Sequence, residues 1–129
     1  MFFLPNQHVA MMILICQEEE VMLTALEFRL NKQGFDVGTA NNKKSAISFI
    51  EKNNPALIVA DILSEKVDGM DLLLHTHHTL GKKTPFIVLA ELEEDESVFK
   101  ALQAGASDFI SKPFNPVELL IRIRRILEK

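Results

Sequence analysis

The sequence predicts an α/β fold in which one doubly wound, five-stranded parallel sheet carries helices on both faces. Two observations predict this fold. Short unbroken apolar runs, such as residues 56–61, have the length and composition of strands buried on both sides. Between these runs, apolar residues recur every three or four positions, as they do in amphipathic helices. Because the two kinds of segment alternate, right-handed crossovers leave few ways to wind the chain.

Each element has its own signal in the sequence. The strands are expected at residues 11–16, 35–40, 56–61, 85–90 and 108–111. The helices are expected from Val21 to Gly34, around 46–50 until residue 53, from about 70 to 80, from the acidic stretch 91–96 to Gly105, and from Asn115 to the chain end. The last helix has the clearest start, since Asn115 can cap it and Pro116 suits its first position.

Length and composition favour one soluble domain. The chain has 129 residues, of which 47% are hydrophobic and 25% charged, and this balance is typical of folded proteins. Its net charge of −4 argues against a nucleic-acid-binding surface. No apolar run approaches the roughly 20 residues of a membrane span. We therefore expect a cytoplasmic domain at residues 11–129, preceded by an extension at residues 1–10 that takes no part in the fold.

Three predicted strands are followed by ionisable side chains. Glu18 comes after the first strand, Asp61 ends the third and Lys112 follows the fifth. The carboxyl ends of parallel strands share one edge of a sheet, where ligands bind in open α/β folds. Clustered carboxylates repel each other unless a cation compensates, and Mg²⁺ suits a site with few carboxylates. Lys112 could then face a bound phosphoryl group, towards which Asp61 could act as nucleophile.

These residues belong to a longer set of motifs in the same order along the chain. Asp61 is followed by Asp68-Gly69 seven and eight residues later, by Ala-Gly-Ala at residues 104–106, and by Lys-Pro-Phe at residues 112–114. Together with the acid after the first strand, they resemble the receiver domain of two-component response regulators. The resemblance covers about residues 11–127 and implies a flavodoxin-like sheet with the strand order 2-1-3-4-5.

The resemblance also implies a function and a set of roles. Asp61 would accept a phosphoryl group from a sensor histidine kinase or a phosphotransfer protein. Glu18 and the backbone carbonyl of Leu63 would bind Mg²⁺ together with Asp61. Lys112 would pair with the phosphoryl group, through a strand-to-helix loop that begins with a cis Lys112-Pro113 bond. Phe109 would be the aromatic side chain that turns inward on activation. Such a domain is a signalling phosphoacceptor and not a turnover enzyme.

The sequence departs from the family pattern at four positions. Gln17 replaces the usual first acid and would bind the metal weakly or through water. Ala90 replaces a Thr or Ser, so a hydrogen bond to the phosphoryl oxygen worth roughly 0.5–1.5 kcal/mol is lost. Glu91 stands where a small residue is usual, and Glu65 replaces a proline. These changes favour an alternative, a pseudo-receiver that acts as a phosphorylation-independent interaction module.

Two further sets of residues allow more than one interpretation. Asp108 and Arg122 match positions that form salt bridges across dimers of winged-helix response regulators, which implies a homodimer through the fourth helix, fifth strand and fifth helix. A Glu118–Arg122 pair within the last helix explains the same residues equally well. Phe109 could likewise be a switch residue or an ordinary core aromatic residue.

The other candidate sites are weaker. Of the histidines at positions 75, 77 and 78, the first and last share a helix face and suggest zinc. With no Cys and no third ligand at suitable spacing, an exposed helix surface is the better interpretation. A Mg²⁺-dependent phosphatase or hydrolase is disfavoured, because no second acid lies two residues after Asp61.

Overall fold

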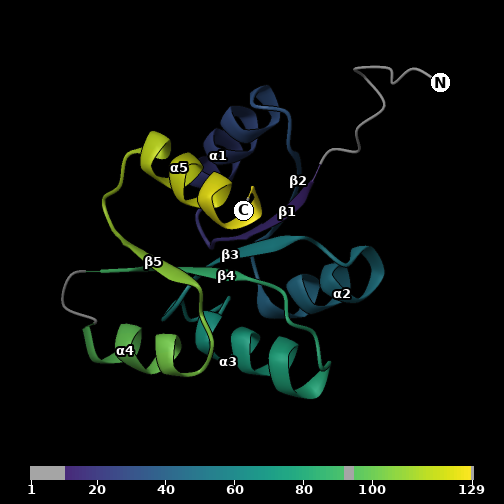
Figure 1. Ribbon diagram of the computed structural model, residues 1–129, viewed down its shortest axis with the longest axis vertical. Coiled ribbons are helices and arrows are strands. Elements are labelled where there is room, and N and C mark those ends of the chain that lie inside the picture. The colour runs from purple at the N-terminus through teal and green to yellow at the C-terminus, as the bar shows by residue number, and fades with distance from the viewer. Residues whose placement is uncertain (1–10, 92–94, 129) are drawn as a thin grey trace.

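The computed structural model describes residues 11–91 and 95–128. Within these residues, five parallel strands form one sheet in the order β2-β1-β3-β4-β5, as Figure 1 shows. The strands are β1 (Met12–Cys16), β2 (Asp36–Ala40), β3 (Leu57–Asp61), β4 (Phe86–Ala90) and β5 (Asp108–Ser111). The predicted fold class and strand order are confirmed. The first four strands begin one residue later than predicted and end at the predicted residue.

The helices cover both faces of the sheet. α1 and α5 lie on one face, and α2, α3 and α4 lie on the other (Figure 1). The helices are α1 (Glu20–Lys32), α2 (Lys43–Asn53), α3 (Gly69–Leu74), α4 (Asp95–Gln103) and α5 (Pro116–Leu127), and α3 continues into a π-helical segment, η2 (His75–Thr79). The sheet is therefore the middle of three layers.

The central strands β1, β3 and β4 are unbroken apolar runs because each contributes to two cores. In β1, Ile13 and Ile15 pack towards α1 and α5, whereas Leu14 and Cys16 pack towards the opposite layer. All four side chains are fully buried. Burial raises the pKa of the Cys16 thiol, because a thiolate has no solvation in the core. Side chains alternate between the two faces of a strand, so a polar residue at any of these positions would enter one core.

The helix ends follow the predicted signals. α1 ends before Gly34, which has a φ of 95° that favours glycine. The Asn115 side chain accepts a hydrogen bond from the backbone N–H of Val117 at 2.8 Å and so caps α5. The cap fixes where the chain turns from the sheet into α5.

The third helix differs from the prediction of one α-helix over about residues 70–80. It changes at His75 into a π-helical segment, in which Leu80 donates to the carbonyl five residues back. The hydroxyl of the buried Thr76 also donates to the carbonyl of Leu72 at 2.8 Å. The expectation of an exposed histidine surface is wrong for His75 and His77, which are both half-buried. The His77 ring contacts the Thr84 carbonyl and packs edge-on against Phe86.

Some predictions fall on residues outside the described parts of the chain. These are the predictions for the extension at residues 1–10 and for part of the acidic start of the fourth helix, at residues 92–94. In the described residues, no helix is long and apolar enough to cross a bilayer.

Candidate functional site

Asp61 and Lys112 form a nearly buried ion pair at the carboxyl edge of the sheet. Asp61 is the last residue of β3, and Lys112 directly follows β5. The Lys112 ammonium donates to Asp61 Oδ2 at 2.7 Å, and the Lys112 and Asp61 side chains are 20% and 10% exposed. Charges this well shielded from water interact more strongly than those of a surface pair. The two residues meet as the parallel strands predict, while their chemical roles stay predictions.

The backbone of the neighbouring strand helps to hold Lys112. Its N–H donates to the carbonyl of Ala90, the last residue of β4, at 2.8 Å. The peptide bond between Lys112 and Pro113 is cis, as the resemblance implies. This backbone hydrogen bond therefore connects Lys112 directly to position 90, where the family usually carries a side-chain hydroxyl.

Glu18 lies on the exposed rim of the same edge and is held by the loop after β3. Its Oε2 accepts hydrogen bonds from the Ser64 hydroxyl at 2.5 Å and from the Lys66 backbone N–H at 3.4 Å. The Ser64 bond, the Lys66 bond and the positive charges of Lys66 and Lys112 hold the pKa of Glu18 below its usual range. Because β1 and β3 are neighbours in the sheet, Glu18 and the Asp61 pair lie at the same edge. Sequence reasoning missed Ser64, whose only signal was a hydroxyl in the loop after Asp61.

Gln17 faces α1 instead of the Asp61 pair. Its side chain is 4% exposed. The amide nitrogen donates to the Met22 sulfur at 3.3 Å, and the amide oxygen accepts from the Glu19 backbone N–H at 3.2 Å. Both ends of the amide are thus used at the start of α1. A weak or water-mediated metal contact by Gln17 stays a prediction that would require this arrangement to change.

Gly69 allows α3 to begin directly against the phosphoacceptor candidate. A Cβ atom on Gly69 would lie 2.4 Å from the Asp61 carbonyl oxygen, closer than real Cβ contacts. The preceding Asp68 has a φ of 49°, and its side chain accepts from the backbone N–H of Asp71 at 3.2 Å. The Asp68-Gly69 pair therefore combines a helix cap with a close backbone approach, which gives a physical reason for the motif.

The oxygen atoms at this edge suit a hard cation. The described residues contain no cluster of three or more His, Cys, Asp or Glu that could hold a metal. Mg²⁺ needs fewer protein ligands, because it is usually held by one or two carboxylates and keeps several waters. The carboxylates of Glu18 and Asp61 and the backbone carbonyl of Leu63, in the loop that follows β3, match that requirement. The donor set fits Mg²⁺, although the individual ligand roles stay predictions.

Ala90 and Phe109 lie on the two strands beyond Asp61. Ala90 is 1% exposed at the end of β4 and brings no polar atom from its side chain. Phe109 lies on β5, next to Val88 in the register, and its side chain is 37% exposed. The phenylalanine is therefore partly outside the core, and its interpretation as an ordinary core residue is wrong for this structure. Its role as a switch stays a prediction.

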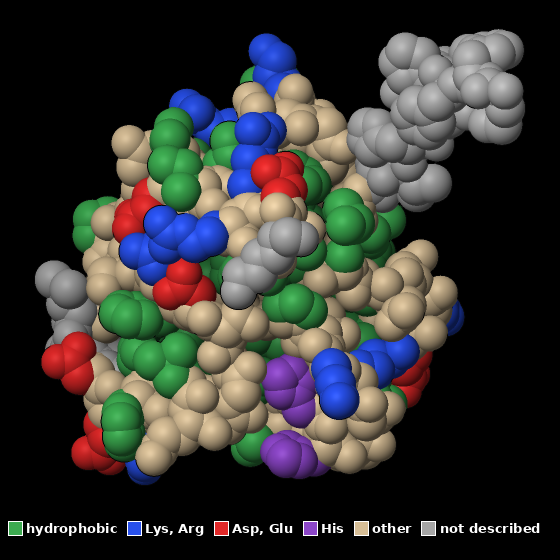
Figure 2. All heavy atoms as spheres, viewed as in Figure 1, with side chains coloured by type: hydrophobic (Ala, Val, Ile, Leu, Met, Phe, Trp, Pro, Cys, Tyr) green, Lys and Arg blue, Asp and Glu red, His purple; other side chains and the backbone are tan. Residues whose placement is uncertain are grey.

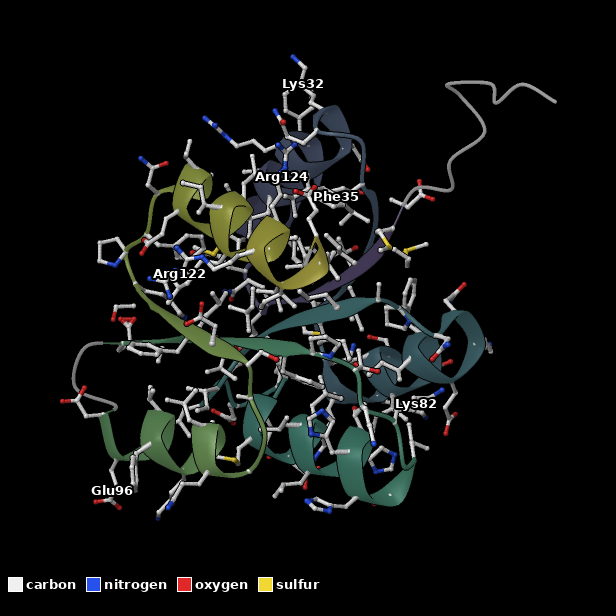
Figure 3. All side chains as sticks on the ribbon, in the orientation of Figure 1. Lys32, Phe35, Lys82, Glu96, Arg122 and Arg124 are labelled. Atoms are coloured by element: carbon white, nitrogen blue, oxygen red, sulfur yellow. The ribbon has the colours of Figure 1, made fainter. Side chains whose placement is uncertain are left out.

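Arg122 joins α5 to β5 within one chain. Figure 3 shows Arg122 on the side of α5 that faces β5. Its guanidinium donates to Asp108 at 2.7 Å, to the Phe109 carbonyl at 3.0 Å and to Glu118 at 3.2 Å. The structure thus contains the predicted Glu118–Arg122 pair, and it adds the Asp108 contact inside the same domain. Both acids are satisfied without a second copy of the chain.

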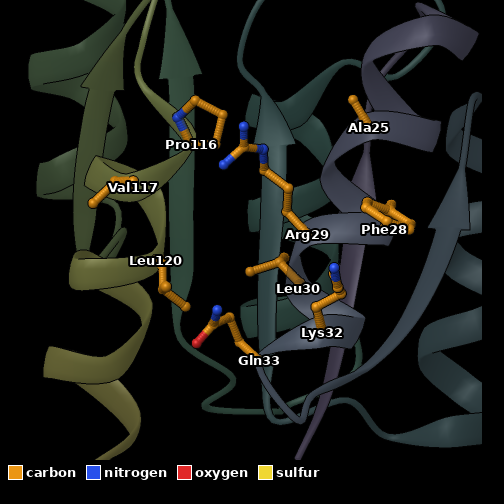
Figure 4. Close-up of a pocket in the computed structure, with 9 residues that line it drawn as sticks. All are labelled: Ala25, Phe28, Arg29, Leu30, Lys32, Gln33, Pro116, Val117 and Leu120. Atoms are coloured by element: carbon orange, nitrogen blue, oxygen red, sulfur yellow. The ribbon is translucent and has the colours of Figure 1, made fainter.

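A cavity between α1 and α5 lies apart from these residues. Its volume is about 470 Å³, and Figure 4 shows side chains from both helices pointing into it. The lining residues are Ala25, Phe28, Arg29, Leu30, Lys32, Gln33, Pro116, Val117 and Leu120. Near one end, Arg124 of α5 donates to Gln33 at 3.0 Å. None of the three charged residues at the sheet edge lines this cavity, so it is no part of the candidate site.

The comparisons with known proteins agree on one family. Residues 13–124 match the family described as the response regulator receiver domain. The chain is 34% identical over 119 residues to the alkaline phosphatase synthesis transcriptional regulatory protein PhoP of Bacillus subtilis, covering 91% of this chain and 48% of PhoP. It is 30% identical over 119 residues to the transcriptional regulatory protein SrrA of Staphylococcus aureus, with the same coverage. The chain thus spans about half the length of these curated relatives.

Solved structures give the same result for the fold. A CheY-like response regulator receiver domain from Methanospirillum hungatei superposes with a TM-score of 0.86 at 28% identity, covering 93% of this chain and 95% of that one. A two-component response regulator from Clostridium difficile gives 0.84 at 27% identity, covering 92% and 97%. The sheet order, the charged edge and the match over nearly the whole chain lead to one conclusion: this chain belongs to the family of response regulator receiver domains.

Proposed function

We propose that this receiver domain takes a phosphoryl group onto Asp61 from a phosphohistidine donor in the cytoplasm. Receiver domains interact with histidine kinases or phosphotransfer proteins and generally bind Mg²⁺ at the phosphorylation site. The observation that carries the proposal for this chain is the Asp61–Lys112 pair, joined at 2.7 Å on the carboxyl edge of the sheet. Glu18, which follows the neighbouring strand β1 at the same edge, supplies the second carboxylate.

The transfer requires little from the protein except position and charge. The Asp61 carboxylate oxygen that Lys112 does not contact attacks the phosphorus and forms a P–O bond. The P–N bond to the donor histidine breaks, and its electron pair stays on the imidazole nitrogen, which takes a proton from water. When the phosphoryl group is bound to Asp61, the Lys112 ammonium can donate to one of its oxygens instead of to the carboxylate. Bound Mg²⁺ would neutralise charge on the phosphoryl oxygens, held by Glu18, Asp61 and the Leu63 carbonyl.

The product remains attached to the domain, so we propose a phosphoacceptor and not a turnover enzyme. A hydrolase of this kind would need a second acid close to the nucleophile, and Leu63 occupies the position two residues after Asp61. A phosphorylation-independent interaction module is not favoured, because the ion pair of the phosphoacceptor site is intact despite the changes at Gln17 and Ala90.

We also propose that α4, β5 and α5 form the face on which two copies associate. Figure 2 shows hydrophobic side chains on the molecular surface over these elements. Exposed apolar side chains there are Phe99, Leu102, Phe109 and Ile121. Burying such side chains stabilises an association, since each removes apolar surface from water. β4 lies between Asp61 and this face. A change at the phosphorylated edge can therefore reach the face through Ala90 and β5.

Mass spectrometry of the intact domain tests the phosphoacceptor proposal. The domain is incubated with Mg²⁺ and acetyl phosphate, and the expected result is one phosphoryl adduct that disappears in Asp61→Asn. Asp68→Asn is the matched control, because it removes a carboxylate from the loop next to the site and should still give the adduct. Absence of an adduct on the wild-type domain, or an adduct that persists in Asp61→Asn, would contradict the proposal.

A further inference from the structure

Among the described residues, the Glu18 carboxylate accepts hydrogen bonds through one of its two oxygens, Oε2. Ser64 and the backbone of Lys66 both donate to Oε2, at 2.5 and 3.4 Å. These donors come from the loop that directly follows Asp61, although Glu18 and Ser64 are 46 residues apart in sequence. The other oxygen, Oε1, is not used by these two donors. The loop of the phosphoacceptor thus fixes the orientation of the acid on the neighbouring strand.

The Ser64 hydroxyl is itself fixed in direction. It accepts a hydrogen bond from the backbone N–H of Val67 at 3.1 Å. A hydroxyl has one hydrogen to donate, and this geometry directs it to Glu18. The loop around Ser64 is also closed by backbone bonds, from Asp68 N–H to the Ser64 carbonyl at 2.8 Å and from Lys43 N–H to the Lys66 carbonyl at 2.9 Å. Ser64 is therefore a donor held in place before any ligand arrives.

The orientation of Glu18 matters more for cation binding here than in a domain with two acids after the first strand. The preceding position is Gln17, whose amide is engaged by Met22 and Glu19 at the start of α1. Glu18 is then the carboxylate left to join Asp61 around a cation. A freely rotating glutamate would lose side-chain entropy on binding a metal, whereas a fastened one has already lost it.

We infer that Ser64 is a positioning residue for Mg²⁺: its hydrogen bond to Oε2 holds Glu18 so that Oε1 is presented to a cation beside Asp61. This inference rests on the proposed function, since it assigns a residue to the same site. Partners that orient a metal-binding carboxylate typically change metal affinity by 10–100-fold when removed. Ser64 acts through Glu18 and does not itself need to touch the metal.

A purely structural role for Ser64 is the competing explanation. The hydroxyl also satisfies the Val67 N–H, so Ser64→Ala could disturb the loop whatever Glu18 does. A double-mutant cycle separates the two roles. If Ser64 acts through Glu18, its removal has no further effect once Glu18 has become Gln; if it acts through the loop alone, its removal has the same effect in both backgrounds.

The experiment is a titration of the domain with MgCl₂ alone, without a phosphodonor, followed by ¹H–¹⁵N NMR shifts. NMR is suitable because the chain has no Trp or Tyr to report binding by fluorescence. We expect Ser64→Ala to raise the Kd about tenfold. Ser64→Thr, which keeps the hydroxyl, should stay close to the wild-type value. Glu18→Gln should weaken binding as well, and adding Ser64→Ala to it should change the Kd little.

Several results would overturn the inference. They are an unchanged Kd in Ser64→Ala, an equal loss in Ser64→Thr, an equal effect of Ser64→Ala with and without Glu18, or no Mg²⁺ binding by the wild-type domain. Failure of the proposed function is seen separately, in the mass experiment with acetyl phosphate. A domain that binds Mg²⁺ through a Ser64-dependent Glu18 but takes no phosphoryl group would retain the inference and lose the function.

Discussion

The carboxyl edge around Asp61 and the outer face around Phe109 are built from different interactions. At the edge, Asp61 and Lys112 form a direct ion pair at 2.7 Å, largely shielded from water. At the outer face, Phe109 is 37% exposed, and the guanidinium of Arg122 is paired with Asp108 and Glu118 of the same chain. Between the two regions lies Ala90, which is fully apolar. The edge thus carries a shielded ion pair, whereas the outer face combines an exposed aromatic side chain with a partly exposed ion pair.

The difference indicates that receiving a signal and passing it on can be altered independently in this domain. The edge keeps the nucleophile and the lysine, so the chemistry of acceptance is retained. At position 90 the link outward is made by the backbone, through the bond from Lys112 N–H to the Ala90 carbonyl and the pairing of β4 with β5, since no side-chain hydroxyl is present there. We therefore expect substitutions at the edge to have large effects on transfer, and substitutions towards the outer face to have smaller ones.

The largest effect is expected from Lys112→Met at the edge. Without the ammonium, the charge that develops on the phosphoryl oxygens has no donor from β5, and transfer from acetyl phosphate should slow about 100-fold. The rate of adduct formation, followed by mass, measures this. Lys66→Met is the matched control, because it removes a lysine from the neighbouring loop without touching Asp61. Equal slowing in both variants would mean that only the overall charge matters.

A smaller effect is expected where the two regions meet, at Ala90. Ala90→Thr restores a hydroxyl that can donate to the phosphoryl oxygen, and Ala90→Val has the same shape without it. The hydroxyl should tighten the binding of beryllofluoride, a mimic of the phosphoryl group, about fivefold, which corresponds to roughly 1 kcal/mol. Calorimetric titration compares the two variants. Equal affinities would show that position 90 does not limit the link between the edge and the outer face.

The smallest effect is expected at the outer face. Arg122→Met should lower the free energy of unfolding by about 0.5–1 kcal/mol, as is typical of partly exposed ion pairs, while Arg125→Met on the exposed side of α5 should change it less. Urea denaturation followed by circular dichroism measures both. If Arg122→Met instead left unfolding unchanged and weakened association of beryllofluoride-loaded domains, Arg122 would belong to an interface between two copies.

The central strands β1, β3 and β4 could be read from the sequence almost residue by residue, because burial on both faces leaves an unbroken apolar run. In β3, the apolar run and the strand both end at Asp61. The end of α3 could not be read this way. A π-helical segment differs from an α-helix by one residue in its hydrogen bonds, and the five residues of η2 are His and Thr only, so they offer no apolar spacing that could tell the two apart.

The site was predictable as far as it follows from the topology. Parallel strands bring Asp61 and Lys112 to one edge, and this needs only their positions at strand ends. Ser64 was missed because a hydrogen bond between two loops leaves no periodic trace in the sequence. Gln17 shows the same limit: its replacement of an acid is visible in the sequence, but its engagement by Met22 depends on the angle at which α1 leaves the sheet.

The burial of Cys16 gives this domain a chemical reporter of its own opening. The thiol is fully buried between β1 and the helices on the α2 side, and the raised pKa keeps it protonated. A thiol reagent can reach it only when the layers that cover it open, so the labelling rate measures how often the centre of the domain opens. With no Trp or Tyr in the chain, this one sulfur atom offers a direct way to ask whether phosphorylation tightens the whole fold or only its edge.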